Sequence, residues 1–178
     1  LQRRNGVEFH AVGGADIRAL APVLNESLSY GVFVPAEGYV TDPFGVVQAF
    51  VQEFLAKGGK IVRADVTGFA WEGGAVSAAA TATGPLSADH YVVAAGAWSG
   101  TLARQFGIRL WIESMRGYHV MLPSPGIELR LPVMFGGSSG LFFATPMKAG
   151  LRLAGTAEFA GLDHPPNYGR ADKLLTLG

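Results

Sequence analysis

The 178-residue chain carries 14 Lys and Arg residues against 14 Asp and Glu, and its basic residues are scattered, which excludes the basic stripe of a nucleic-acid-binding surface. Hydrophobic residues make up 49% and charged residues 16%, a composition typical of a folded core and not of a disordered protein. No apolar run approaches the roughly 20 residues of a membrane-spanning helix, and the absence of cysteine excludes disulfides, thiolate catalysis and cysteine-ligated zinc.

The first part of the chain is predicted to hold a short helix at 16–21 and a strand at 30–34. A longer helix is predicted over 43–57, because Asp42 is a good N-cap and Pro43 takes the first helical position, where its missing N–H costs nothing. Its apolar residues recur at helical spacing and should form one apolar face: Val47, Phe50, Val51, Phe54 and Leu55.

Three strands are predicted next, at 60–71, 75–83 and 90–95, and the tight link between the first two makes them antiparallel neighbours. Beyond Gly107, the turn-separated strand patterns predict an antiparallel sheet over residues 110–155. Its strands are expected at 110–122, 131–135, 140–145 and 151–154, and a final helix is expected at 168–177.

The stretch 88–99 reads Ala-Asp-His-Tyr-Val-Val-Ala-Ala-Gly-Ala-Trp-Ser. Its unbroken apolar run at 91–95 predicts a parallel strand buried on both faces. Gly96 has no Cβ, so backbone or a ligand can approach closely, and a short helix at 101–106 follows. A strand that ends in glycine and turns into a helix is where α/β sheets bind nucleotides. An ordinary packing turn between a strand and a helix is the alternative explanation of the pattern.

Together with Ala-Thr-Gly at 82–84, this stretch resembles the D-amino-acid oxidase-like family of FAD-dependent oxidoreductases, and within it the bacterial D-amino-acid dehydrogenases. The resemblance implies an α/β to α+β fold with a three-stranded meander and the last parallel strand of an FAD domain. It places a partial FAD-binding domain, with an N-terminal segment of the substrate domain, at 1–107. A truncated antiparallel-sheet substrate domain then occupies 108–178.

The resemblance implies FAD as the cofactor and places Val66, Ala95, Gly96 and Trp98 at FAD-binding positions. The backbone of Val66 would meet the adenine, although Val66 also fits an ordinary core position. Phe143 matches a position where related glycine oxidases carry a tyrosine that contacts the substrate. A phenylalanine at this position would still form an apolar wall over the flavin, but it has no hydroxyl to hydrogen-bond a carboxylate. The alternative is that Phe143 is an ordinary core residue.

No catalytic residue and no metal site is assigned. The four histidines show no i, i+4 pair and the carboxylates form no acid/base pair. In family order, the arginines that bind the substrate carboxylate lie beyond Gly178, and neither Arg152 nor Arg170 sits in the matching motif. Residues 136–140 fit Gly-x-Ser-x-Gly, but a strand pattern follows where a hydrolase elbow needs a helix, so hydrolysis is disfavoured.

The implied reaction is oxidation of a D-amino acid to a keto acid and ammonia, by hydride transfer to FAD. The alternatives are a related flavoenzyme acting on a secondary amine or on glycerol 3-phosphate, and a non-catalytic binding module. The small-molecule substrate, the electron acceptor and the oligomeric state stay open. A cytoplasmic location is expected, with peripheral attachment to the inner membrane as the alternative.

The family's Gly-x-Gly-x-x-Gly loop, which binds the FAD pyrophosphate, does not occur in the 178 residues. We therefore expect the chain to be an internal part of a longer enzyme that, on its own, neither binds FAD tightly nor turns over. The strand at 91–95 would then lack its parallel neighbours, so self-association through exposed edges, or partial disorder, is predicted.

Overall fold

The structure is a computed structural model and describes residues 6–137 and 140–177. Contacts divide the chain into two compact units, each assembled from separate segments. The first unit comprises residues up to 48, residues 117–157 and residues from 167 onward, and the second comprises 49–116 and 158–166. The division into domains at Gly107 stays a prediction.

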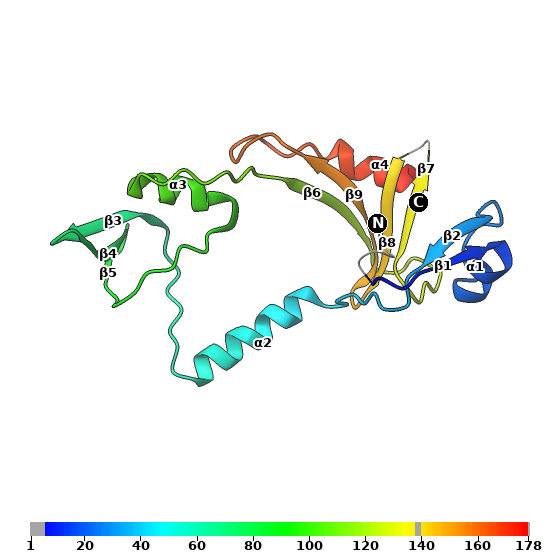
Figure 1. The fold of residues 1–178 in the computed structure, drawn as a ribbon, viewed down its shortest axis with the longest axis horizontal. Helices are drawn as coiled ribbons and strands as arrows, with labels where there is room; N and C mark the ends of the chain where they lie inside the picture. The colour runs from blue at the N-terminus through cyan, green and yellow to red at the C-terminus, as the bar shows by residue number, and fades with distance from the viewer. Residues whose placement is uncertain (1–5, 138–139, 178) are drawn as a thin grey trace. The chain divides into compact units, whose positions relative to one another are not determined.

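The first unit contains a four-stranded sheet with the strand order β6-β9-β8-β7 (Figure 1). The strands are β6 (Arg116–Leu122), β7 (Val133–Gly137), β8 (Gly140–Met147) and β9 (Gly150–Glu158). Strand β8 pairs antiparallel with both β7 and β9. The predicted antiparallel sheet is therefore confirmed. The first strand is shorter than predicted, because residues 110–115 have no strand beside them within the described chain.

One face of this sheet packs into the hydrophobic core of the first unit. Leu174, in α4 (Gly169–Leu177), has 0% of its surface exposed. It lies in one cluster with Phe142 and Ala144 of β8 and with Leu151 and Leu153 of β9. The alternation of strand residues therefore places these four side chains on the buried face and their sequence neighbours on the opposite face. The predicted final helix is confirmed.

A smaller hairpin belongs to the same unit. Strands β1 (His10–Gly13) and β2 (Tyr30–Phe33) pair antiparallel, with α1 (Gly14–Leu20) between them in sequence. Ala21, directly after α1, is buried in the core cluster that contains Leu174. The predicted helix at 16–21 and strand at 30–34 are confirmed, with α1 starting two residues earlier.

The predicted helix over 43–57 is confirmed as α2 (Pro43–Ala56). It ends at two glycines, where Gly58 takes the left-handed conformation at φ 84° and the Gly59 N–H donates to Phe54 O at 2.9 Å. No residue of α2 is buried, and Phe50 on its apolar face is 73% exposed.

Asp42 joins the start of α2 to the turn between β8 and β9. Its Oδ1 accepts a hydrogen bond from Gly45 N at 2.9 Å, and its Oδ2 pairs with Lys148 Nζ at 2.9 Å. The backbone N–H of Lys148 donates to Thr41 O at 2.9 Å. The hydrogen bond from Lys148 and then that from Gly45 lower the pKa of Asp42, because both favour the carboxylate.

The contribution of Asp42 to stability should disappear at low pH. A carboxyl group with a lowered folded pKa stabilises the fold fully above its unfolded pKa, about 3.9, and loses that effect as pH falls through the folded pKa. We expect the Tm of wild type to fall more steeply below about pH 4 than that of Asp42→Asn, whose amide still caps the helix but does not titrate. Melting curves recorded across this range check this, and identical slopes would contradict it.

The second unit contains a meander with the strand order β3-β4-β5 (Figure 1). The strands are β3 (Val66–Glu72), β4 (Ala75–Thr81) and β5 (Gly84–Leu86), all antiparallel. The predicted pairing of the first two strands is confirmed, although β3 starts at Val66 and not at residue 60. The third strand of the meander, β5, was missed because its three residues include a glycine and a proline, which are typical of turns.

The predicted strand at 90–95 is wrong, because the described residues contain no strand beside it that could complete a ladder. Tyr91 instead ties this extended segment to the meander: its hydroxyl donates to Ser77 O at 2.8 Å and accepts from Ala88 N at 2.9 Å. Val92 is 87% exposed and not buried on both faces.

A helical stretch follows this segment and covers part of the meander. It consists of the 3-10 turn η2 (Gly96–Trp98), α3 (Ser99–Ala103) and the 3-10 turn η3 (Arg104–Phe106). The Phe106 ring centroid lies 4.8 Å from that of Phe69 in β3, and Gln105 Nε2 donates to Thr67 O at 3.2 Å. The predicted helix at 101–106 is confirmed and begins earlier than expected.

Candidate functional site

The second unit has a cavity of about 660 Å³ between the meander and residues 91–102. Three of the four predicted FAD positions line it: Val66 at the start of β3, Ala95 just before η2, and Trp98 at the end of η2. A volume of this size lies within the range of about 300–1,000 Å³ typical of ligand pockets. The structure thus brings together residues that are well separated in the sequence.

Gly96 does not line the cavity, but it makes the turn between two residues that do. Its φ is 54°, in the left-handed region that L side chains rarely adopt, and no heavy atom lies within 4 Å of the position a Cβ would take. Glycine at this point lets the chain turn directly from the extended segment into η2, which places Ala95 and Trp98 on the same cavity.

The rest of the lining is mostly apolar. Phe69 from β3 and Leu102 from α3 contribute to the walls, and Asp65 supplies the one carboxyl side chain among the lining residues. Sequence reasoning missed these three. Phe69 and Leu102 have the pattern of ordinary core residues, and Asp65 precedes a strand without any distinctive spacing. An apolar cavity with few polar groups suits a flat aromatic ring system better than a highly charged ligand.

The fifth predicted site residue, Phe143, lies in β8 of the first unit. It pairs in register with Met134 of β7 and Ala154 of β9, and 41% of its surface is exposed. Its neighbours Phe142 and Ala144 belong to the buried cluster, so Phe143 points to the opposite face of the sheet. The alternative of a core position for Phe143 does not fit this placement.

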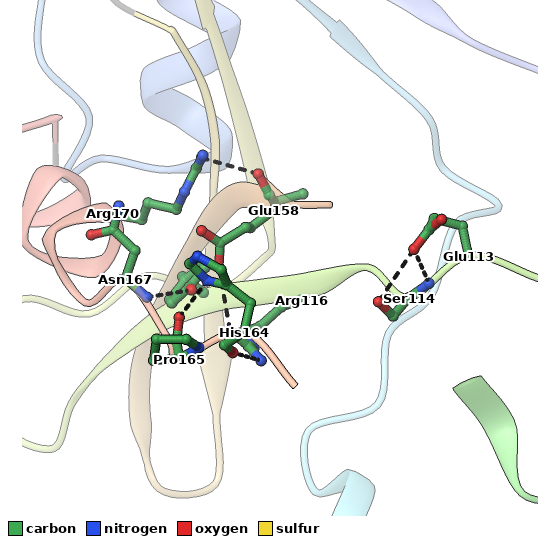
Figure 2. Close-up of polar contacts among 10 residues, drawn as sticks. Glu113, Ser114, Arg116, Glu158, His164, Pro165, Asn167 and Arg170 are labelled. Atoms are coloured by element: carbon green, nitrogen blue, oxygen red, sulfur yellow. Dashed lines mark hydrogen bonds and ion pairs between the residues drawn. The ribbon is translucent and has the colours of Figure 1, made fainter. Parts of the chain in front are cut away.

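In the second unit, Arg116 makes polar contacts that hold the loop at 158–164 (Figure 2). Arg116 Nη1 pairs with Glu158 Oε2 at 3.4 Å, and its Nη2 donates to His164 O at 2.8 Å. The His164 ring Nδ1 lies 2.9 Å from Pro165 O. Arg116 therefore fixes both ends of the loop at 158–164. The sequence at 116–119 has the pattern of a sheet-edge or solvent-facing run, and no local spacing links residues 116 and 158.

The Gly-x-Ser-x-Gly sequence at 136–140 does not have the surroundings of a nucleophile elbow. Ser138 and Ser139 lie outside the described residues, but β7 ends at Gly137 and β8 begins at Gly140. A strand therefore follows the motif where the elbow requires a helix. The structure thus gives no support to hydrolysis at this position.

A second cavity of about 780 Å³ in the same unit is lined by Arg104, Trp111 and residues around them, and none of the predicted site residues faces it. The described chain contains no group of three or more His, Cys, Asp or Glu side chains placed to hold a metal ion. Among the same residues, no helix has the length and apolar character needed to span a bilayer.

A family model described as FAD-dependent oxidoreductase, abbreviated DAO, matches residues 1–177. The chain belongs to the DAO family. This confirms the family inferred from the sequence, and the family is one of FAD-dependent enzymes. The mixed α/β fold with antiparallel sheets agrees with the expected fold class.

Named relatives support the same assignment. A D-amino-acid oxidase of Bradyrhizobium diazoefficiens is 38% identical over 98% of this chain and 41% of its own length. A D-amino acid dehydrogenase of Paramagnetospirillum magneticum is 31% identical over 90% of this chain and 39% of its own length. Among solved structures, a glycine oxidase from Bacillus cereus superposes with a TM-score of 0.79 at 22% identity, over 99% of this chain and 48% of that one. The chain thus spans less than half the length of these proteins.

Proposed function

We propose that the whole protein containing this chain is an FAD-dependent oxidoreductase that oxidises the amine of a D-amino acid. The observation that carries the proposal is the 660 Å³ cavity of the second unit. Three residues that the family resemblance places at FAD-binding positions line it, and they come from separate parts of the sequence. Membership of the DAO family and the relatives named for D-amino acids support the reaction type and the substrate class.

In this proposal the cavity of the second unit holds part of FAD. Val66, Ala95 and Trp98 would pack against the cofactor and exclude water from it, while Gly96 makes the turn that places Ala95 and Trp98 on the cavity. The mostly apolar lining favours the ring systems of the cofactor over its phosphates. The phosphates would need donors beyond this cavity, as the family's glycine-rich loop supplies.

When bound, FAD supplies the acceptor for the hydride that leaves the substrate Cα. The amine loses a proton, and water then hydrolyses the resulting imine to a keto acid and ammonia. The role of this chain's residues is to bind and orient. Phe143, on the exposed face of the sheet, would provide an apolar wall that excludes water from the substrate, and it has no hydroxyl with which to hydrogen-bond a carboxylate.

Spectroscopy of the whole protein tests the proposal. We expect a yellow protein whose flavin absorbance bleaches when a D-amino acid such as D-alanine is added under anaerobic conditions. The L-enantiomer serves as the matched control and should leave the spectrum unchanged. A colourless protein that takes up no added FAD would contradict the cofactor assignment. Bleaching by a secondary amine or by glycerol 3-phosphate alone would keep the cofactor and refute the substrate.

A further inference from the structure

The extended segment 88–95 forms one wall of the cavity in the second unit without belonging to a sheet. Residues 91–95 all line this cavity, together with the start of β3 and Ala79 of β4. Within the described chain, no strand pairs with the segment, and no backbone hydrogen bond joins residues 88–94 to the meander. Because an extended chain without ladder bonds opens easily, this wall needs another contact to hold it in place.

The hydroxyl of Tyr91 supplies that contact. It donates to Ser77 O in β4 at 2.8 Å and accepts from Ala88 N at 2.9 Å, so one oxygen serves as both donor and acceptor. The first bond ties the segment to the meander, and the second closes the bend around Asp89 within the segment. The bond to Ser77 is partly buried, which strengthens it because water competes less for the carbonyl.

Tyr91 also controls where the rest of the wall lies. The chain runs from Tyr91 directly to Ala95 and into η2, which bring Ala95 and Trp98 to the cavity. Fixing the segment at Tyr91 therefore restricts the positions of these two residues. In the sequence, Tyr91 is one member of an apolar run, and nothing local indicates that its hydroxyl bonds to a residue 14 positions earlier.

We propose that Tyr91 is a positioning residue for FAD, whose hydroxyl holds segment 88–95 against β4 so that the cavity wall is formed before the cofactor binds. The proposal rests on the proposed binding of FAD in this cavity and adds a residue that the family resemblance does not mark. A preformed wall raises affinity, because binding then does not have to order the segment. When the wall is formed only part of the time, the apparent Kd rises by the inverse of that fraction.

The test compares the deflavinated whole protein with its Tyr91→Phe and Thr67→Val variants. Tyr91→Phe keeps the ring and removes one oxygen with both of its bonds. Thr67→Val is the matched control, because Thr67 Oγ1 also donates to a carbonyl of β4, Ala80 O at 3.3 Å, but Thr67 does not line the cavity. Amide hydrogen exchange without FAD reports how often residues 88–95 open. Titration with FAD, followed by flavin fluorescence, gives the affinity.

In Tyr91→Phe we expect residues 88–95 to exchange faster and the affinity for FAD to fall about 3- to 30-fold, with the upper limit set by the loss of two hydrogen bonds of ordinary strength. Thr67→Val should match wild type in both measurements to within about twofold, since the control bond lies outside the wall. If Tyr91→Phe does not fold by circular dichroism, Ala88→Pro decides, because it removes only the N–H donor and keeps Tyr91 bonded to Ser77.

Unchanged affinity in folded Tyr91→Phe would overturn the proposal even with faster exchange, because the hydroxyl would then only stabilise the unit. Weaker binding without faster exchange would overturn it as well, since the wall would not have moved, and so would equal weakening in Thr67→Val. A wild type that takes up no FAD would refute the proposed function itself, whereas equal binding by wild type and Tyr91→Phe refutes only this inference.

Discussion

Replacing Leu174 by alanine should lower the free energy of unfolding by about 2–5 kcal/mol, the range for removing a buried leucine side chain and leaving a cavity. Leu174 is the one described residue whose large side chain is completely enclosed, with 0% exposure. It fills the space between α4 and the buried face of the sheet, against Phe142 and Leu153. Denaturation of the whole protein by urea, followed by circular dichroism, measures the change.

Leu175 provides the control for this experiment. It is the next residue of the same helix and is also a leucine, but 51% of its surface is exposed. Leu175→Ala should therefore change stability by no more than about 0.5 kcal/mol. Similar losses for the two variants would show that helix propensity, and not packing on the sheet, determines the effect. A loss confined to Leu174→Ala would link the helix to the sheet that carries Phe143 and Arg152.

The elements that the sequence predicted well are those specified by local interactions. The helix α2 begins at Pro43 because Asp42 accepts the hydrogen bond from Gly45 N, and two glycines end it. The hairpin of β8 and β9 follows from short apolar strands joined by a tight turn at 148–149. In both cases the residues that determine the structure lie within a few positions of one another.

The failures concern features that depend on distant partners. Residues 91–95 have the composition of a buried strand, but a strand also needs neighbouring strands, and none of the described residues provides them. The helical spacing of α2 predicted its apolar face but not its exposure, which depends on residues distant in the sequence. The pairing of Arg116 with Glu158 could not be predicted, because the two residues are 42 positions apart in the sequence and no local spacing links them.

Filling the cavity of the second unit should weaken FAD binding without unfolding the protein. Ala95 lines this cavity and is only partly buried, so Ala95→Trp can place its ring in the space proposed for the cofactor. Forcing extra volume into an occupied space typically costs about 1–3 kcal/mol, which corresponds to a roughly 5- to 150-fold loss of affinity. Titration of the deflavinated whole protein with FAD, followed by flavin fluorescence, measures it.

Ala82→Trp introduces the same side chain at an exposed position of the same unit, in the turn between β4 and β5, which does not line the cavity. This control should bind FAD like wild type, because its added ring extends into solvent. Both variants should melt at wild-type temperatures without the cofactor. If Ala95→Trp retains wild-type affinity while folded, the cavity between the meander and residues 91–102 does not hold FAD. Equal weakening in both variants would instead point to a general effect of added bulk on this unit.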